Sequence, residues 1–279
     1  MKRQTSFKND SSKLYLVATP IGNLKDITIR AIETLKQVDY IYCEDTRTSQ
    51  KLLKAYDIEK PLRSVHLFNE NEISESIIQT IKQGNNVAII SDAGLPIISD
   101  PGWIVVHDAI ENDIDVVVIP GPSAGISALI ASGISSTKYL FVGFLNSKKG
   151  KRKEELKELL KSKETIVMYE SPHRIEETLN ILNELDPNRY ICLARELTKI
   201  HEEYLRGLPC EVLDVIDTIK GEIVLIIEAK KEEENKDISI EDLYNTYINE
   251  CIDSKVALTK VSKELNVSKK IVYEKIKKH

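Results

Sequence analysis

The chain has little of several features that would assign it to a specialised class of proteins. Its four cysteines stand far apart in 279 residues and form none of the paired spacings of zinc sites or disulfide frameworks, which favours reduced cytosolic thiols. No apolar run approaches the roughly 20 residues that a membrane-spanning helix needs. Residues 1–12 are polar, so we expect a disordered start without a secretory signal peptide. Together these absences predict a soluble, cytoplasmic protein.

An excess of one charge and clusters of metal ligands are missing as well. The formal net charge of −5 gives no overall attraction to nucleic acid, so any such attraction must be local. The five histidines have no ligand-like partners at helical spacing, and we expect no metal site. What the chain does have is an apolar content of 42% and a charged content of 30%, which predicts an ordinary globular core.

Short apolar runs alternate with helical patterns over most of the chain, which predicts an α/β fold with mainly parallel strands. Many of the runs are β-branched or aromatic, as is typical of buried strands. We expect strands at Leu14–Ala18, Tyr40–Cys43, Val87–Ile90, Val116–Ile119, Tyr139–Phe144, Ile166–Tyr169, Tyr190–Leu193 and Ile223–Ile227. We expect helices at Thr28–Lys36, Ser49–Tyr56, Ile73–Gln83, Trp103–Asn112, Ser123–Ala131, Lys153–Lys161, Arg174–Glu184 and Glu211–Ile219.

The sequence predicts two α/β domains, at 13–120 and 121–230, because Gly121-Pro122 and the small-residue helix after it make a hinge. The charge run 230–237 is expected to be a linker. Residues 238–279 show helical patterns that resemble a helix-turn-helix.

In this tail Val256, Leu258, Val261 and Leu265 are expected to share one helix face, and Ser268 to cap the last helix. The tail is basic, with eight lysines against two glutamates over residues 255–279. Charge alone leaves two interpretations open, a solvated helical tail or a nucleic-acid contact.

Acidic and glycine-rich loops follow the expected strands of the first domain, where an open α/β sheet binds its ligands. The loop 91–102 carries Asp92 and Asp100, which could bond ribose hydroxyls or a cation, although Asp100 could instead cap a helix. The turn Pro120–Ala124 leaves room for a planar ligand and exposes N–H donors, or else serves close helix packing. The loop 19–23 lacks the dinucleotide and P-loop signatures, and is either a backbone cradle or a simple turn.

Two strand ends carry groups suited to proton transfer. Glu44 or Asp45 could act as a general base while Arg47 binds a phosphate, and the alternative is a helix N-cap with a local ion pair. His173, beside Arg174, is the histidine best placed for proton transfer near neutral pH, although a lone histidine is more often structural.

Two further segments are rich in charge. The basic residues 148–153 would oppose a helix dipole, so a flexible loop that contacts phosphates explains them better than a local structural role, with a merely solvated loop still open. The alternating charges at 194–199 could form an internal ion-pair network.

Six strings occur in a fixed order along the chain: Leu-Val-Ala-Thr-Pro-Ile-Gly-Asn-Leu, Glu-Asp-Thr-Arg, Ser-Asp-Ala-Gly-Leu-Pro-x-Ile-Ser-Asp-Pro-Gly, Pro-Gly-Pro-Ser-Ala, Tyr-Glu-Ser-Pro-His-Arg and Arg-Glu-Leu-Thr-Lys. Together they resemble the small-subunit ribosomal RNA cytidine 2′-O-methyltransferase family, a branch of the tetrapyrrole-methylase superfamily. The likeness covers about residues 13–228, and the family also has a tail of the helix-turn-helix type. One departure is Asn146, where relatives often have proline.

This resemblance implies two α/β domains with S-adenosylmethionine in the cleft between them, and commonly a homodimer. It implies methyl transfer to the ribose 2′-hydroxyl of a decoding-region cytidine in the 16S ribosomal RNA of the small subunit. The implied cofactor contacts, of which the last two would lie near the adenine, are Asp92, Ala93, Gly94, Leu95, Pro120, Ser123, Ala124, Met168 and Ala194.

Removal of the 2′-hydroxyl proton calls for a base, for which the candidates in falling order are Asp45, Glu44, Asp100 and His173. The expected RNA contacts are Arg47, Lys148, Lys149, Lys151, Arg152, Arg174, Lys269 and Lys270. Two rival functions stay open. One is a methylase of a tetrapyrrole precursor, and the other is a non-catalytic RNA-binding factor of ribosome assembly.

Overall fold

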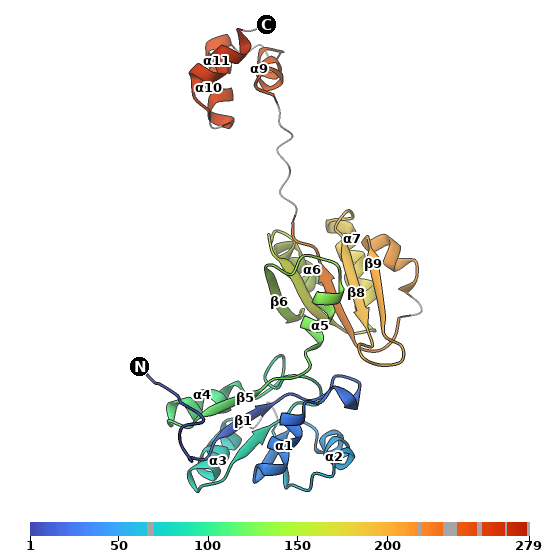
Figure 1. Cartoon of the computed structure of the whole chain (residues 1–279). Coiled ribbons are helices and arrows are strands. Elements are labelled where there is room, and N and C mark those ends of the chain that lie inside the picture. The colour runs from blue at the N-terminus through green and yellow to red at the C-terminus, as the bar shows by residue number, and fades with distance from the viewer. Residues whose placement is uncertain (66–69, 217–218, 231–238, 250–252, 266, 278–279) are drawn as a thin grey trace. The chain divides into compact units, whose positions relative to one another are not determined.

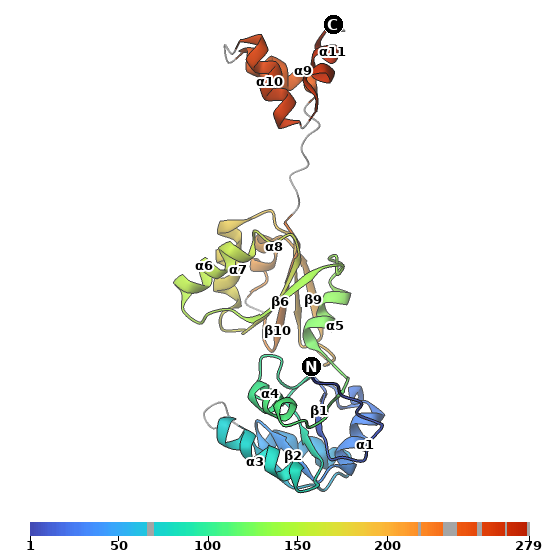
Figure 2. The same cartoon turned by 90° about the vertical axis from the view of Figure 1, so that its left-hand side faces the viewer.

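The apolar runs form strands that gather into two five-stranded sheets (Figure 1, Figure 2). A computed structural model describes residues 1–65, 70–216, 219–230, 239–249, 253–265 and 267–277. The chain divides into two units, residues 1–230 and 231–279. The domain boundaries predicted from the sequence stay predictions, and nearly all of the expected linker lies outside the described residues.

The first sheet is fully parallel, with the strand order β3-β2-β4-β1-β5. Its strands are β1 (Leu14–Val17), β2 (Tyr40–Cys43), β3 (Leu62–Ser64), β4 (Val87–Ile89) and β5 (Val116–Ile119). The connecting helices are the 3₁₀ turn η1 (Leu24–Asp26), α1 (Ile29–Gln37), α2 (Thr46–Ala55), α3 (Glu70–Lys82) and α4 (Trp103–Glu111).

Both faces of this sheet are covered by helices. Side chains alternate along a strand, so Leu14 and Leu16 pack with α3 and α4 while Val17 packs with α1 and α2. Burial on both sides explains why these strands appear in the sequence as nearly continuous apolar runs. Because all five strands are parallel, their carboxyl ends share one edge, and the loops that follow them meet there.

The second sheet is mixed, with the strand order β6-β7-β10-β8-β9. Its strands are β6 (Tyr139–Phe144), β7 (Thr165–Glu170), β8 (Ile191–Arg195), β9 (Glu203–Gly207) and β10 (Ile223–Ile227). One face packs on α5 (Ala124–Ala131), and the other on α6 (Lys149–Leu159), α7 (Ile175–Leu185) and α8 (Pro209–Leu213).

The predicted fold class is correct, but the prediction of mainly parallel pairing is wrong for the second sheet. Only β6 and β7 are parallel neighbours, whereas β10 runs antiparallel to both β7 and β8, and β9 antiparallel to β8. Seven residues, 196–202, join β8 to β9, and a parallel pair needs a crossover of roughly a dozen or more. The short strands β3 and β9 were not predicted, and α8 is shorter than the expected helix 211–219.

The second unit contains α9 (Ile240–Asn249), α10 (Ser254–Glu264) and α11 (Lys269–Ile276). Its core contains Leu243, Val261 and Val272. The Ser268 hydroxyl accepts a hydrogen bond from the Ile271 N–H at 3.4 Å, which confirms the predicted cap. Val256, expected on the apolar face, is 48% exposed.

Residues 1–12 form no helix or strand in the structure. Their predicted disorder stays a prediction, although the Gln4 amide donates to the Val116 carbonyl at 2.7 Å and accepts from the Val116 N–H at 3.1 Å. Among the helices that the structure describes, none has the length and apolarity to cross a membrane.

Candidate functional site

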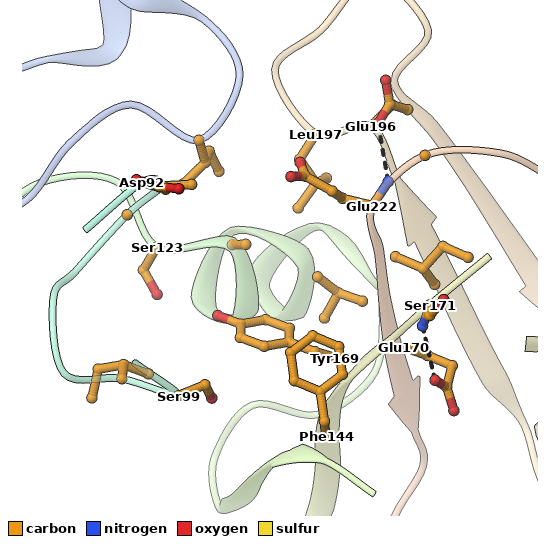
Figure 3. A pocket seen from close by; sticks show the side chains of 18 of the residues that line it. Asp92, Ser99, Ser123, Phe144, Tyr169, Glu170, Ser171, Glu196, Leu197 and Glu222 are labelled. Carbon is orange, nitrogen blue, oxygen red and sulfur yellow. Dashed lines mark hydrogen bonds between the residues drawn. The ribbon is translucent and has the colours of Figure 1, made fainter. Parts of the chain in front are cut away.

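A cavity of about 630 Å³ lies at strand ends of both sheets (Figure 3), which is a volume typical of small-molecule sites. It is lined by Ile21, Asp92, Ala93, Gly94, Leu95, Ile98, Ser99, Asp100, Ser123, Ala124, Phe144, Tyr169, Glu170, Ser171, Pro172, Glu196, Leu197, Lys199, Gly221, Glu222, Ile223 and Val224. Five of these lining residues are carboxylic acids and one is a lysine. Three of these acids are paired with Arg174 or Lys199, so Asp92 and Asp100 are left to favour a ligand with positive charge.

The loop after β4 is held to the end of β1 by a short antiparallel bridge. The Thr19 N–H donates to the Gly94 carbonyl at 2.8 Å, and the Gly94 N–H donates back to the Thr19 carbonyl at 3.1 Å. Gly94 has φ +80°, and an added Cβ would lie 3.3 Å from Ile21. A side chain at Gly94 would therefore strain the backbone and crowd the cavity wall. The predicted loop residues 92–95 all line the cavity.

The turn after β5 brings the start of α5 to the same cavity. An added Cβ on Gly121 would lie only 2.8 Å from the Ala18 Cβ, so glycine permits the close approach of the β1 and β5 ends. Ser123 is the N-cap of α5 but makes no side-chain capping bond there, and its side chain lies at the cavity (Figure 3). Ser123 and Ala124 line the cavity as predicted, whereas Pro120 does not.

Asp100 lies in the cavity wall in a setting that disfavours its charged form. Burial and the neighbouring carboxylates of Glu44 and Asp92 raise the pKa of Asp100 to about 6. The loop that carries it is strained, because Ile97 (φ +76°) and Ser99 (φ +67°) adopt left-handed backbone conformations. Asp100 is therefore poised to exchange a proton near neutral pH.

Asp45, the first candidate base from the sequence, is occupied by other bonds. Its carboxylate caps α2 by accepting from the Arg47 N–H at 2.8 Å, and it pairs with the Arg47 guanidinium at 2.8 Å. These bonds lower the pKa of Asp45 to about 2, which makes it a weak proton acceptor. The structure thus matches the cap-and-ion-pair interpretation, and neither Glu44, Asp45 nor Arg47 lines the large cavity.

Glu170 organises the loop that follows β7. It accepts hydrogen bonds from Arg174 Nε at 2.9 Å and from the Thr178 hydroxyl at 2.6 Å, while Arg174 also donates to the Leu145 carbonyl. Arg174 is therefore held in an internal ion pair, which weighs against its predicted role as a phosphate ligand. His173 is exposed and does not line the cavity, so the structure does not bring it together with Asp100.

The turn after β8 carries the ion-pair network that the sequence predicted. Lys199 Nζ lies 2.9 Å from both Glu196 Oε1 and Glu222 Oε2, and Glu196 and Thr198 have positive φ values. The start of β10, residues 221–224, also lines the cavity and was missed. In a parallel sheet only the carboxyl end of β10 would lie at the ligand-binding edge, whereas the antiparallel β10 brings its beginning there.

The side chains of Met168 and Ala194 lie away from the cavity, and their predicted place near the adenine stays a prediction. Both are fully buried, and their side chains belong to the cores on opposite faces of the second sheet. Strand alternation directs them toward the covering helices, and neither lines the cavity. Phe144 and Tyr169 line it instead. Phe144 could have been found by the same strand-end rule, since β6 is parallel to β7.

The basic segment 148–153 is helical rather than a flexible loop. Lys148 is the N-cap of α6, which begins at Lys149 instead of the expected Lys153. Acidic residues of α7 neutralise the basic first turn: Glu177 pairs with Lys149 and Arg152, and Glu184 with Lys153.

The accessibility of the predicted RNA contacts therefore differs from one residue to another. Arg152 is only 1% exposed, so it cannot reach a phosphate and is corrected as an RNA contact. Lys148, Lys151, Lys269 and Lys270 are exposed. In the part of the chain that the structure describes, no cluster of three or more His, Cys, Asp or Glu could hold a metal ion.

Residues 13–211 match the family model described as Tetrapyrrole (Corrin/Porphyrin) Methylases. The chain belongs to the tetrapyrrole methylase family. It is 45% identical to the Ribosomal RNA small subunit methyltransferase I of Bacillus subtilis, with 98% of each chain covered. It is 47% identical to the Haemophilus influenzae protein of that name, over 80% of this chain and 81% of the relative. These findings confirm the family that the six sequence strings predicted, and it is a family of methyltransferases.

Two solved structures share the fold. A diphthine synthase matches with a TM-score of 0.62 at 15% identity, over 78% of this chain and 90% of its own. The uroporphyrin-III-C-methyltransferase of Thermus thermophilus matches with a TM-score of 0.57 at 17% identity, over 78% of this chain and 94% of its own. These likenesses concern the fold alone and support the arrangement of two α/β halves.

Proposed function

We propose that this protein transfers a methyl group from S-adenosylmethionine to the ribose 2′-hydroxyl of a decoding-region cytidine in 16S ribosomal RNA. The observation that carries the proposal is its 45% identity over 98% of the chain to a protein named as a small-subunit ribosomal RNA methyltransferase. The cavity supports a working enzyme, because its loops are held in place by specific bonds and strained turns.

The cavity residues fit the cofactor, which supplies an electrophilic methyl group on a sulfonium when bound. Its cationic sulfonium and ammonium groups suit the acidic lining, in which Asp92 and Glu222 are exposed. Gly94 and Ala124 are small residues that leave space in the cavity for the cofactor. The Ser123 hydroxyl offers a hydrogen-bond partner. We assign cofactor binding to Asp92, Ala93, Gly94, Leu95, Ser123 and Ala124.

Asp100 is the base that this geometry favours. Its raised pKa would suit a carboxylate oxygen of Asp100 to accept the proton that the ribose 2′-hydroxyl gives up. A cationic cofactor beside Asp100 would lower that pKa, so that the carboxylate would be charged when the methyl donor is in place. The apolar side chains of Leu95, Ile98 and Phe144 restrict water around the reacting groups.

RNA affinity is assigned to the accessible cations. Lys148 and Lys151 are exposed at the start of α6, and Lys269 and Lys270 are exposed at the start of α11. Their contacts with phosphates would weaken with salt. The small ribosomal subunit is the proposed partner. The homodimer implied by the family and the cytoplasmic location expected from the sequence stay predictions.

The decisive experiment is transfer of labelled methyl from S-adenosylmethionine to small ribosomal subunits from cells that lack this protein. Label on a ribose of 16S ribosomal RNA supports the proposal, and nuclease mapping then identifies the nucleotide. Cofactor binding without RNA labelling would favour a small-molecule methylase. Failure of both would favour a non-catalytic RNA-binding factor.

A further inference from the structure

Three aromatic rings form a row at the cavity end of the second sheet. The Tyr169 ring lies 5.1 Å from Phe141, edge to face at 74°, and 5.5 Å from Phe144 at 57°. The Tyr169 hydroxyl lies near the Gly125 backbone at the start of α5. Tyr169 is thus packed between two neighbouring rings, which makes the row a rigid surface.

A bulge in β6 is what aims Phe144 at this row. Residues three apart in a regular strand point to opposite faces of the sheet, yet Phe141 and Phe144 both contact Tyr169. The pairing of β6 with β7 shifts register between Phe141 and Gly143, and Gly143 has φ +62°. Bulges of this kind turn a side chain toward a functional site.

Phe144 presents a large apolar surface to the cavity. It is 57% exposed, while Tyr169 behind it is only partly exposed. Figure 3 shows both rings side by side near the middle of the view, with Asp92, Ser123 and Ser99 to their left. An open ring with hydroxyl and carboxylate groups around it suits a planar heterocycle with polar edges.

We propose that Phe144, supported by Tyr169, is the surface on which the base of the target nucleotide stacks when that nucleotide leaves the RNA to be methylated. The inference rests on the proposed function and adds a residue that selects the substrate. Asp100 lies close enough to Tyr169 for its charge to act on that ring's hydroxyl. A base stacked on Phe144 would therefore bring its own ribose toward the proposed proton acceptor, while the loop 92–95 across the cavity stays free for the cofactor.

The test compares Phe144→Leu with Phe144→Trp, which keeps a stacking surface. The matched control is Tyr139→Leu, since Tyr139 is on the same strand, is 45% exposed and does not line the cavity. For each variant we would measure kcat/KM toward small subunits and, by calorimetry, the affinity for S-adenosylmethionine. Base–aromatic stacking corresponds to about 5- to 150-fold in affinity.

We expect Phe144→Leu to lose roughly tenfold or more in kcat/KM for the subunit with unchanged cofactor affinity, and Phe144→Trp and Tyr139→Leu to stay near wild type. An equal loss of cofactor affinity in Phe144→Leu would mean that the ring holds the cofactor's adenine, and would overturn the inference. So would full activity of Phe144→Leu. A wild-type protein that binds cofactor but labels no RNA would instead refute the proposed function, and the inference with it.

Discussion

Replacing Asp100 with asparagine should have two opposite effects, a loss of methyl transfer and a gain in the free energy of unfolding. The substitution keeps the size of the side chain and removes its charge and its ability to accept a proton. Methyl transfer to the small subunit should fall by roughly 100- to 10,000-fold, the usual contribution of a general base. Cofactor affinity should change far less, because Asp92 and the loop 92–95 are left intact.

The stability of Asp100→Asn should rise above that of the wild type. The pKa of Asp100 rises from 3.8 in the unfolded chain to about 6 in the fold, so the folded protein binds this proton more tightly. At about 1.4 kcal/mol per pH unit the difference is on the order of 3 kcal/mol, which we reduce to about 1–2 kcal/mol because the carboxylate is partly solvent-exposed. This penalty is absent below about pH 4 and complete above about pH 6.

Urea unfolding at pH 4 and pH 8, beside initial rates with labelled cofactor, checks both effects. Asp100→Asn should match wild type in unfolding free energy at pH 4 and exceed it by about 1–2 kcal/mol at pH 8. The exposed Asp113→Asn serves as the control and should change neither property. Asp100→Asn with more than a tenth of wild-type turnover, or with no gain in stability at pH 8, would refute the reasoning.

Three further predictions concern other parts of the chain. Asp45→Asn should keep most of the turnover, because Asp45 is bound to Arg47 and lies outside the cavity lining; a loss of 100-fold or more in initial rate, with cofactor and RNA binding intact, would restore it as the base. Gly121→Ala should destabilise the protein by about 1–3 kcal/mol in thermal melts, because its Cβ would lie 2.8 Å from the Ala18 Cβ. Removal of residues 231–279 should weaken subunit binding and flatten its salt dependence while calorimetry shows unchanged cofactor affinity, because unit 1–230 holds the whole cavity; an unchanged subunit affinity would assign RNA binding to that unit alone.

The first half of the fold, apart from the short edge strand β3, could be predicted from the sequence because its strands and helices alternate. Each parallel strand there ends at the same edge, so Asp92, Gly94 and Ser123 could be expected to converge before any coordinates were known. The strand directions of the second half were not predicted, because they depend on the number of residues that connect one strand to the next. Strand β9 was not predicted, and it follows β8 too closely for a parallel crossover between the two. Without β9 the antiparallel direction of β10 could not be inferred, so residues 221–224 were not predicted to line the cavity.

The direction of buried side chains and the pairing of charges also could not be predicted from the sequence. The sequence placed Met168 at a strand end, but the alternation that buries it depends on which face the helices cover. The lysines near position 150 looked unsuited to a helix because their partners, Glu177 and Glu184, lie on α7, beyond the intervening strand β7. A local sequence pattern shows which residues are neighbours in the chain. The burial of Met168 and the ion pairs of α6 depend instead on contacts with segments that are distant in the sequence.

The central place of β10 in the second sheet affects how the chain can fold as it is synthesised. The first sheet is complete once Ile119 has emerged, because all its strands precede that residue. The second sheet stays in two separate pairs, β6 with β7 and β8 with β9, until Ile223–Ile227 arrives and joins them. A nascent chain that stops before Ile223 has two additional open strand edges, those of β7 and β8, and lacks part of the cavity wall. The binding site is therefore among the last features to form, and truncated products are prone to aggregate rather than to compete for ligand.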